Sequence, residues 1–246
     1  MLDGFVLSHR LVLLDSRCDI AQDYVFETLI PAFWHTELTP IPEHVFKQTR
    51  EAHLQIMSVE LHIAELLNKF TRSQKRIERR LFEIVLLYRL NCYYLSLESQ
   101  DRTYHRMVTT TGAMLQNRLS LLLLDIHERQ HEHVLSFGKQ NGQINNGWYG
   151  QFLGACGLVR VIRALSSIDG VQIFLANVLD DVDFGIDLFA CHRKRDLAIS
   201  VKSGKISSLM TAAPFLFKPL ENGKEQAIYN GAGLAKVHYD IDFLAV

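Results

Sequence analysis

The sequence predicts an α+β or α/β protein in which an N-terminal helical bundle precedes a mixed central sheet flanked by helices. Residues 43–137 contain no proline and a single glycine, Gly112, and their apolar residues recur at helical spacing. A polar, glycine-containing stretch follows at 138–147, and beyond it short runs of strand-forming residues appear. We therefore expect a helical domain over residues 1–140 and a sheet-containing domain over 141–246.

Three long helices are predicted in the first domain, over about 42–70, 73–98 and 101–137. Each has one apolar face, formed by Val45, Ile56, Val59, Ile63, Leu66, Leu67 and Phe70 in the first, Ile77, Leu81, Ile84, Val85, Tyr88 and Leu95 in the second, and Met107, Met114, Leu115, Leu119, Leu122 and Ile126 in the third. Long helices with short connections pack as an antiparallel bundle. The first forty residues are not assigned to either domain by their sequence.

The second domain is predicted to begin with a helix over 148–167, which carries Phe152, Ala155, Val159, Ile162 and Leu165 in one stripe. Asp169-Gly170 is a turn signal and 171–176 is strand-like. A final strand-like segment occupies 237–246. The expected order is helix, then three strands, then a mixed tail.

A β-hairpin is predicted over residues 183–204. Because strand side chains alternate between faces, Asp183 and Asp187 should share one face of the first strand. A polar turn over 192–196 reverses the chain, and the return strand places Ser200 and Lys202 on one face. Two carboxylates and an ammonium group are thus expected to converge.

Two segments of this hairpin, Gly185-Ile186-Asp187-Leu188 and Val201-Lys202-Ser203-Gly204, resemble the PD-(D/E)xK nuclease superfamily. The resemblance covers about residues 147–246 and implies a restriction-endonuclease-like domain. It also implies Mg²⁺- or Mn²⁺-dependent hydrolysis of DNA phosphodiester bonds, in a restriction, repair or defence role. The N-terminal helices would then serve dimerisation, nucleic-acid contact or a protein partner.

The resemblance assigns roles to individual residues. Asp187 takes the position of the metal-binding Asp, and Lys202 that of the lysine that orients the water or stabilises phosphate charge. Ser200 stands where the second acid is expected, and Gln151 where an upstream Glu is often found. Because Mg²⁺ requires oxygen ligands, Asp183 is a candidate for assisting Asp187. The nearby basic residues Arg193, Lys194, Arg195 and Lys205 are candidate phosphate contacts.

Other interpretations of the same hairpin remain open. The two aspartates could be solvated residues of an edge strand, with Lys202 a surface lysine. The missing acid also fits a catalytically inactive nuclease-fold module that binds nucleic acid or a protein partner. A third possibility is a helical adaptor with an unrelated sheet domain, which predicts an exposed apolar stripe on the bundle.

Two weaker patterns lie in the helical part. His127 and His131, with His133 nearby, have the spacing of a metal-binding pair on a helix, although their charged neighbours favour an exposed helix end. A basic junction, formed by Lys69, Arg72, Lys75, Arg76, Arg79 and Arg80, could contact phosphates. It could equally be a solvated face on which Glu78 and Glu83 pair locally.

Composition sets the outer limits. With 26 basic and 27 acidic residues, the whole chain offers no strong field for nucleic acid, so any such binding relies on local patches. The four cysteines lack metal-site spacing, no signal peptide is evident, and the longest apolar run, Leu119 to Leu124, is too short for a membrane span. We expect a cytoplasmic protein with reduced thiols that does not contact membranes. The absence of a P-loop, GxGxxG, GxSxG or HExxH motif leaves NTP-driven, dinucleotide-dependent, serine-hydrolase and zincin mechanisms without support.

Overall fold

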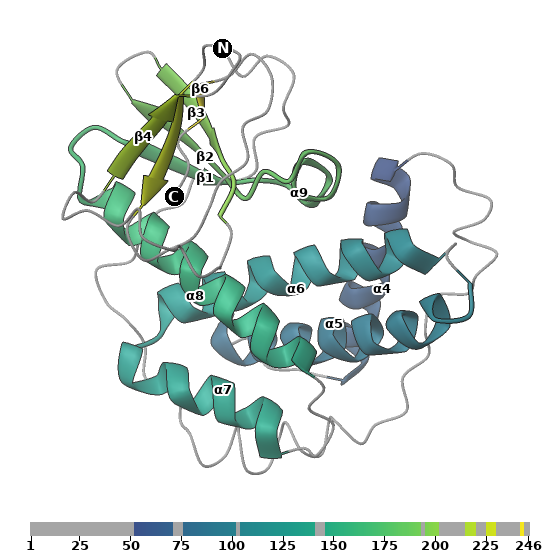
Figure 1. Cartoon of the computed structure of the whole chain (residues 1–246). Coiled ribbons are helices and arrows are strands. Elements are labelled where there is room, and N and C mark those ends of the chain that lie inside the picture. The colour runs from purple at the N-terminus through teal and green to yellow at the C-terminus, as the bar shows by residue number, and fades with distance from the viewer. Residues whose placement is uncertain are drawn as a thin grey trace. The chain divides into compact units, whose positions relative to one another are not determined.

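The computed structural model describes residues 52–70, 76–101, 104–140, 146–192, 195–201, 215–219, 225–229 and 242–243 (Figure 1). The fold is of the α+β type. The chain divides into two compact units within one helix, between Phe152 and Leu153. The boundary between the two units is therefore C-terminal to the polar stretch at 138–147, where the sequence predicted it. Each unit is described by itself below.

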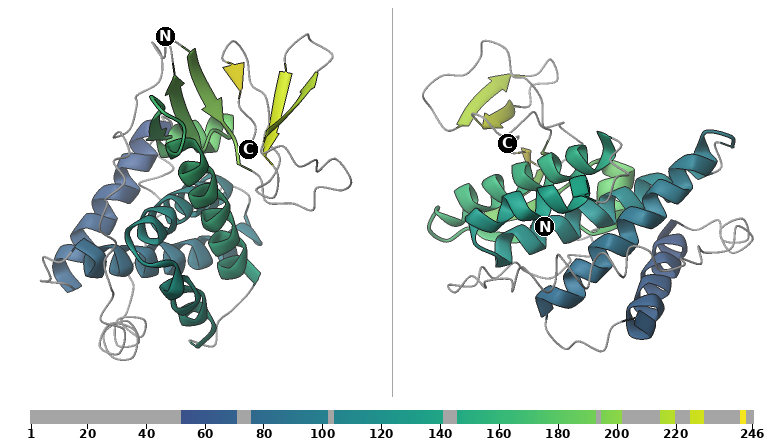
Figure 2. Two further views of the ribbon diagram at one scale, coloured as in Figure 1. Left: turned by 90° about the vertical axis from the view of Figure 1, so that its left-hand side faces the viewer. Right: turned by 90° about the horizontal axis from the view of Figure 1, so that it is seen from below.

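The first unit is helical. It contains α4 (Ala52–Phe70), α5 (Arg76–Glu98), α6 (His105–Asp125), the 3-10 turn η3 (Glu128–Gln130), α7 (His131–Gln140) and the start of α8 (Asn146–Ser166). Helix α5 packs along α6, and α4 packs on α5 (Figure 2). The predicted helices at 73–98 and 148–167 are confirmed within a few residues. Residues 42–51 of the first predicted helix lie outside the described residues.

The predicted apolar faces form the core of this unit. In α4 the side chains of Val59, Ile63, Leu66 and Leu67 are buried, and in α6 every predicted core position from Met107 to Ile126 is buried. In α5 the prediction holds for the four positions from Leu81 to Tyr88, but it is wrong for Leu95, which is exposed. Helical periodicity therefore located most of the core.

The third predicted helix, 101–137, is wrong in its length, because α6 ends at Asp125. Ile126 has extended backbone, with φ −106° and ψ 161°, and a new helix starts only at His131. A polar cluster lies at this end. Arg80 pairs with the Asp125 carboxylate and also donates to the Leu121 carbonyl at 3.1 Å. Arg76 adds a contact to Asp125 at 3.2 Å.

The second unit contains the rest of α8, two sheets and a short helix. One sheet has the order β1 (Gln172–Leu175), β2 (Leu188–His192), β3 (Arg195–Ile199), β6 (Asp242–Phe243), and the other pairs β4 (Phe215–Pro219) with β5 (Glu225–Tyr229). The β1–β2 and β2–β3 pairs are antiparallel, and β3 pairs with β6 in parallel. The predicted helix and the three strands that follow it are present, but a short helix over Val178–Phe184 that was not predicted lies between β1 and β2.

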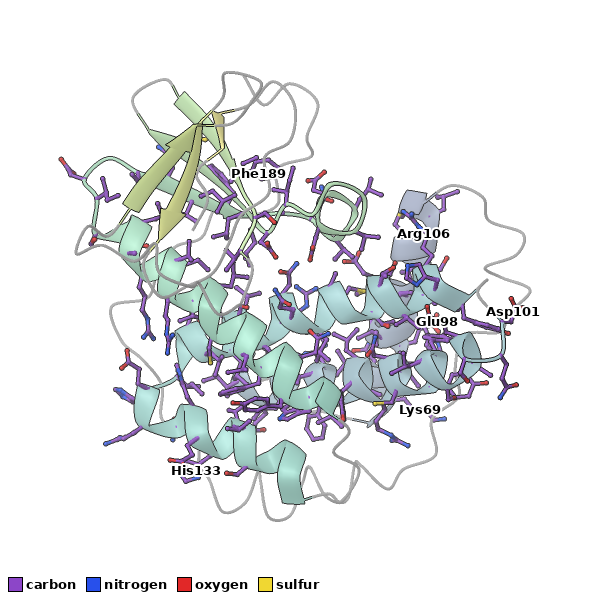
Figure 3. The ribbon with its side chains drawn as sticks, viewed as in Figure 1. Lys69, Glu98, Asp101, Arg106, His133 and Phe189 are labelled. Atoms are coloured by element: carbon purple, nitrogen blue, oxygen red, sulfur yellow. The ribbon has the colours of Figure 1, made fainter. Side chains whose placement is uncertain are left out.

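Both faces of the central strand β2 are buried. Phe189 (Figure 3) packs with Ala176, Ile186 and Ala198 on one face, while Leu188 on the other face is also fully buried. A strand covered on both faces reads as a continuous apolar run. The edge-strand interpretation of this hairpin therefore fails for β2.

Among the described helices, none combines the length and the apolar character that a membrane span requires.

Asp125 should be the most sensitive polar residue of the helical unit. The Asp125 and Arg80 side chains are only 10% and 14% exposed, and burial already lowers the pKa of the Arg80 guanidinium while Asp125 opposes that shift. Replacing Asp125 by Ala would leave a buried cation without its carboxylate, at a cost of about 2–4 kcal/mol. The measurement is the free energy of unfolding in urea, followed by circular dichroism.

The matched control for Asp125→Ala is Glu98→Gln. Glu98 pairs with His105 at 2.6 Å, and the His105 side chain is 68% exposed. Exposed pairs contribute less than about 1 kcal/mol. Equal losses for the two variants would contradict the assigned role of Asp125.

Candidate functional site

The candidate site lies at the open end of the β2–β3 hairpin. Leu188 pairs with Ile199, so the register places Asp187 opposite Ser200. The backbone N–H of Asp187 donates to the Ile199 carbonyl at 2.8 Å, and the backbone N–H of Val201 donates to Asp187 Oδ2 at 2.6 Å. The structure therefore brings Asp187 beside Ser200, and the Asp187 carboxylate binds the backbone of the neighbouring strand.

Asp187 is also held from its other side. The Ala176 N–H donates to the Asp187 carbonyl at 3.1 Å, which extends the β1–β2 pairing by one step. The backbone of Asp187 thus bonds to segments on both sides of it. Because strand faces alternate, its side chain shares a face with Ala176, Phe189 and Ser200.

A short helix, α9 (Val178–Phe184), precedes the segment that leads through Asp187 into β2. Asn177 caps its start by accepting from the Asp180 N–H at 2.9 Å. Gly185 ends it in the left-handed conformation, with φ 67° and ψ 31°, and its N–H donates to the Asp181 carbonyl at 2.8 Å. Glycine adopts this conformation without the cost that a Cβ imposes. The chain then turns directly into Asp187.

The prediction that Asp183 and Asp187 share one strand face is wrong. Asp183 belongs to α9, and two turn residues, Gly185 and Ile186, separate that helix from Asp187. The alternation argument therefore does not apply to Asp183. Its proposed role as an assisting metal ligand loses the argument on which it rested.

The site is buried. Asp187 is 3% exposed and Ser200 is fully buried. The Ser200 hydroxyl finds no hydrogen-bond partner among the described residues. The Val201 N–H compensates part of the desolvation of the Asp187 carboxylate by a charge-assisted hydrogen bond.

These residues do not fit a firmly held Mg²⁺. Mg²⁺ binds through carboxylate oxygens in near-octahedral geometry, and here one of the two Asp187 oxygens already bonds to an N–H. Ser200 offers a neutral hydroxyl in the position of a second acid. Within the described part of the chain, no group of three or more His, Cys, Asp and Glu residues could hold a metal ion.

The backbone of Arg195 lies at the end of β3 that is away from Asp187, whereas the basic turn was predicted to sit beside the site. His192 pairs with Arg195, so these residues belong to the strands and only residues 193–194 connect them. This connection lies at the other end of β2 from Asp187, at a distance of about 16 Å for five strand residues. Arg193, Lys194, Lys202 and Lys205 lie outside the described residues, as does the side chain of Arg195.

Gln151 belongs to the helical unit, whereas Asp187 and Ser200 belong to the sheet unit. Its Nε2 atom lies 3.3 Å from the position that a Cβ on Gly112 would occupy. The Asn91 amide nitrogen lies 3.5 Å from the same position, and it donates to the Val108 carbonyl and to Thr111 Oγ1. Gln151 therefore packs against α6, where the absence of a side chain on Gly112 admits it.

The described residues of the other two candidate patterns are arranged as follows. His127 precedes η3 in extended backbone while His131 starts α7 and contacts the Leu123 carbonyl at 2.9 Å, so the two do not share a helix. Of the neighbours taken to indicate an exposed helix end, Glu128, Arg129 and Glu132 are exposed, but Gln130 is buried. In the basic junction, Arg76 and Arg80 bind Asp125, and Glu83 binds Arg118 of α6 at 2.7 Å instead of pairing locally.

Comparisons of the chain with protein-family models, with characterised protein sequences and with solved structures returned no match. The resemblance to the PD-(D/E)xK superfamily thus rests on the hairpin motifs and stays a prediction.

The contact with Val201 predicts a graded response at position 187. Asp187→Ala removes the acceptor and should cost about 1–3 kcal/mol, because a buried N–H is left unsatisfied. Asp187→Asn retains an oxygen acceptor of the same size and should lose less. Hydrogen–deuterium exchange of the peptide that contains Val201 should increase strongly in Asp187→Ala and weakly in Asp187→Asn. Equal exchange in both variants would show that the acceptor is not required.

A double-mutant cycle tests the packing of Gln151. Gly112→Ala should stabilise α6 by about 1 kcal/mol through helix propensity, but only where the new Cβ meets no obstacle. In the wild-type background Gln151 Nε2 opposes that gain, and in a Gln151→Ala background the gain should appear in full. The free energies of unfolding of the four proteins give the coupling. Additivity within about 0.3 kcal/mol would place Gln151 elsewhere.

Proposed function

We propose that the sheet unit is a nuclease-type DNA-binding domain that does not cleave DNA, joined to a helical unit for association with another molecule. The observation that carries this proposal is the state of Asp187. It is 3% exposed, its Oδ2 accepts the Val201 N–H at 2.6 Å, and its cross-strand neighbour is Ser200. Its carboxylate serves as a backbone acceptor in the sheet, and the position opposite it supplies no second charge for a metal.

The DNA-binding part of the proposal rests on the resemblance and on the basic sequence at the closed end of the hairpin. Arg193 and Lys194 connect two strands that pair up to His192 and Arg195. Arginine and lysine groups bind phosphates and release condensed counterions, which gives affinity that falls steeply with salt. Such contacts position a protein on a duplex without reading its sequence. We therefore propose binding to DNA backbone, largely independent of sequence.

The test combines binding and cleavage in one set of proteins. Fluorescence anisotropy measures binding to linear and branched DNA at several salt concentrations, and gel assays with Mg²⁺ or Mn²⁺ measure cleavage of the same substrates and of supercoiled DNA. We expect binding without cleavage. The double variant Arg193→Ala, Lys194→Ala should reduce the slope of log K against log salt by about 2, because two phosphate contacts are lost.

The control for charge is Arg129→Ala, Arg160→Ala, which removes the same net charge from two exposed residues that are not among the candidate phosphate contacts. It should leave the salt slope unchanged. Metal-dependent cleavage that is lost in both Asp187→Ala and Lys202→Ala would overturn the proposal and establish a nuclease. Absence of both binding and cleavage would remove DNA as the ligand.

A further inference from the structure

Helix α4 has two apolar faces. Val59, Ile63, Leu66 and Leu67 are buried in the helical unit. On the opposite side, Leu54, Met57 and Leu61 are 41%, 51% and 62% exposed. At 100° per residue, Leu61 and Ile63 point to opposite sides of the helix. A helix that is apolar on both sides is normally covered on both sides.

The outer face has the spacing of a coiled-coil seam. Its exposed residues are Leu54, Met57, Leu61, Ala64 and Asn68, which follow one another at alternating steps of three and four. This is the a and d pattern of two heptads, with Leu54, Leu61 and Asn68 at a positions. An Asn at one a position specifies register at a cost in stability. We call this set the α4 seam.

The flanks of the α4 seam are acidic. In the same heptad frame Glu60 is at a g position and Glu65 at an e position, and both are exposed. Residues at e and g choose the partner and its orientation through interhelical charge pairs. Lys69, near the end of α4 (Figure 3), lies outside these positions. A helix seated on the seam would therefore meet negative charge on both sides.

These charges argue against a second copy of the chain as the occupant. In a parallel pair, Glu60 at g would face Glu65 at e of the second copy, and in an antiparallel pair g residues face each other, so Glu60 would meet Glu60. Like charges at these positions destabilise the pairing. A helix with lysine or arginine at e and g would form attractive pairs on both flanks.

From these observations we infer that the α4 seam is a docking site for an amphipathic helix of another protein, with apolar a and d residues flanked by basic residues. The contact is of the helix-on-helix type, read by anchors at i, i+3 and i+7. The three partly exposed side chains, Leu54, Met57 and Leu61, would be its central anchors. This inference does not depend on DNA binding by the sheet unit.

The probe is a synthetic peptide of three heptads with Leu at a and d and Lys at e and g, compared with the same peptide carrying Glu at e and g. Like charges on its flanks keep each peptide from pairing with itself. Titration calorimetry with the full chain should show binding of the Lys peptide at least about tenfold tighter than that of the Glu peptide. Leu61→Ser should weaken it about tenfold, as expected for a lost buried Leu. Met57→Ser gives an independent second variant.

Two control variants make the result specific. Leu95→Ser removes a comparably exposed leucine from α5 and should leave binding unchanged. Glu60→Lys, Glu65→Lys should reverse the preference between the two peptides. Glu128→Lys, Glu132→Lys, which makes the same charge change at other exposed positions, should not.

Three results would overturn the inference. Equal affinities for the Lys peptide and the Glu peptide would mean that the contact is a non-specific apolar one. A mass in analytical ultracentrifugation that doubles with concentration in wild type but not in Leu61→Ser would make a second copy the occupant. Absence of peptide binding by the folded full chain would show that the seam is not open to a helix of another protein.

Discussion

Burial of α5 is the constraint on which the helical unit depends. Nine of its side chains are buried and they point in nearly all directions around the helix, namely Leu81, Phe82, Ile84, Val85, Leu86, Leu87, Tyr88, Leu90 and Tyr94. A helix covered in this way must be the central element, with its neighbours packed around it. The apolar contacts supply most of the stability, because hydrophobic burial is the dominant favourable term in folding.

Polar contacts then fix how α5 and α6 align. Near the start of α5, Arg76 and Arg80 hold Asp125 at the end of α6, and further along, Asn91 donates to Val108 and Thr111. These links tie the two helices at separate points, as an antiparallel arrangement requires. Tyr88 lies between Arg80 and Asn91 in the sequence and makes a T-shaped contact with Trp148. Burial raises the pKa of its phenol. Apolar area alone would tolerate sliding of one helix along the other, which these directional bonds oppose.

Much of the fold follows from the helical periodicity of the apolar residues. The errors fall at the end of one helix and at one short helix. The faces of α4, α6 and α8 were predictable because apolar residues recur at helical spacing over many turns. The end of α6 was not, since no glycine or proline marks Ile126. The short helix α9 was not predicted, and its last two residues were taken as strand, although its signals were present: Asn177 as cap, acidic residues in the first turn and Gly185 at the end.

The candidate site was predictable only in part, for a related reason. Antiparallel pairing of two apolar runs was enough to bring Asp187 beside Ser200. It could not show that the carboxylate would accept the Val201 N–H. That contact depends on the register, which a one-residue change in the turn alters throughout a hairpin. Gln151 was assigned by motif position, and its contact with Gly112 depends on helix packing that no local pattern encodes.

The two units differ in what their exposed and buried groups permit. In the sheet unit the Asp187 carboxylate is buried and bonded to the backbone of the neighbouring strand, where it serves the pairing of the chain. In the helical unit the situation is reversed, since Leu54, Met57 and Leu61 stay partly exposed on α4 although their burial would be favourable. An isolated fold gains nothing from such residues at coiled-coil spacing with like charges along both flanks. Their spacing and the charges beside them are those that a covering helix of complementary charge would need, as inferred above.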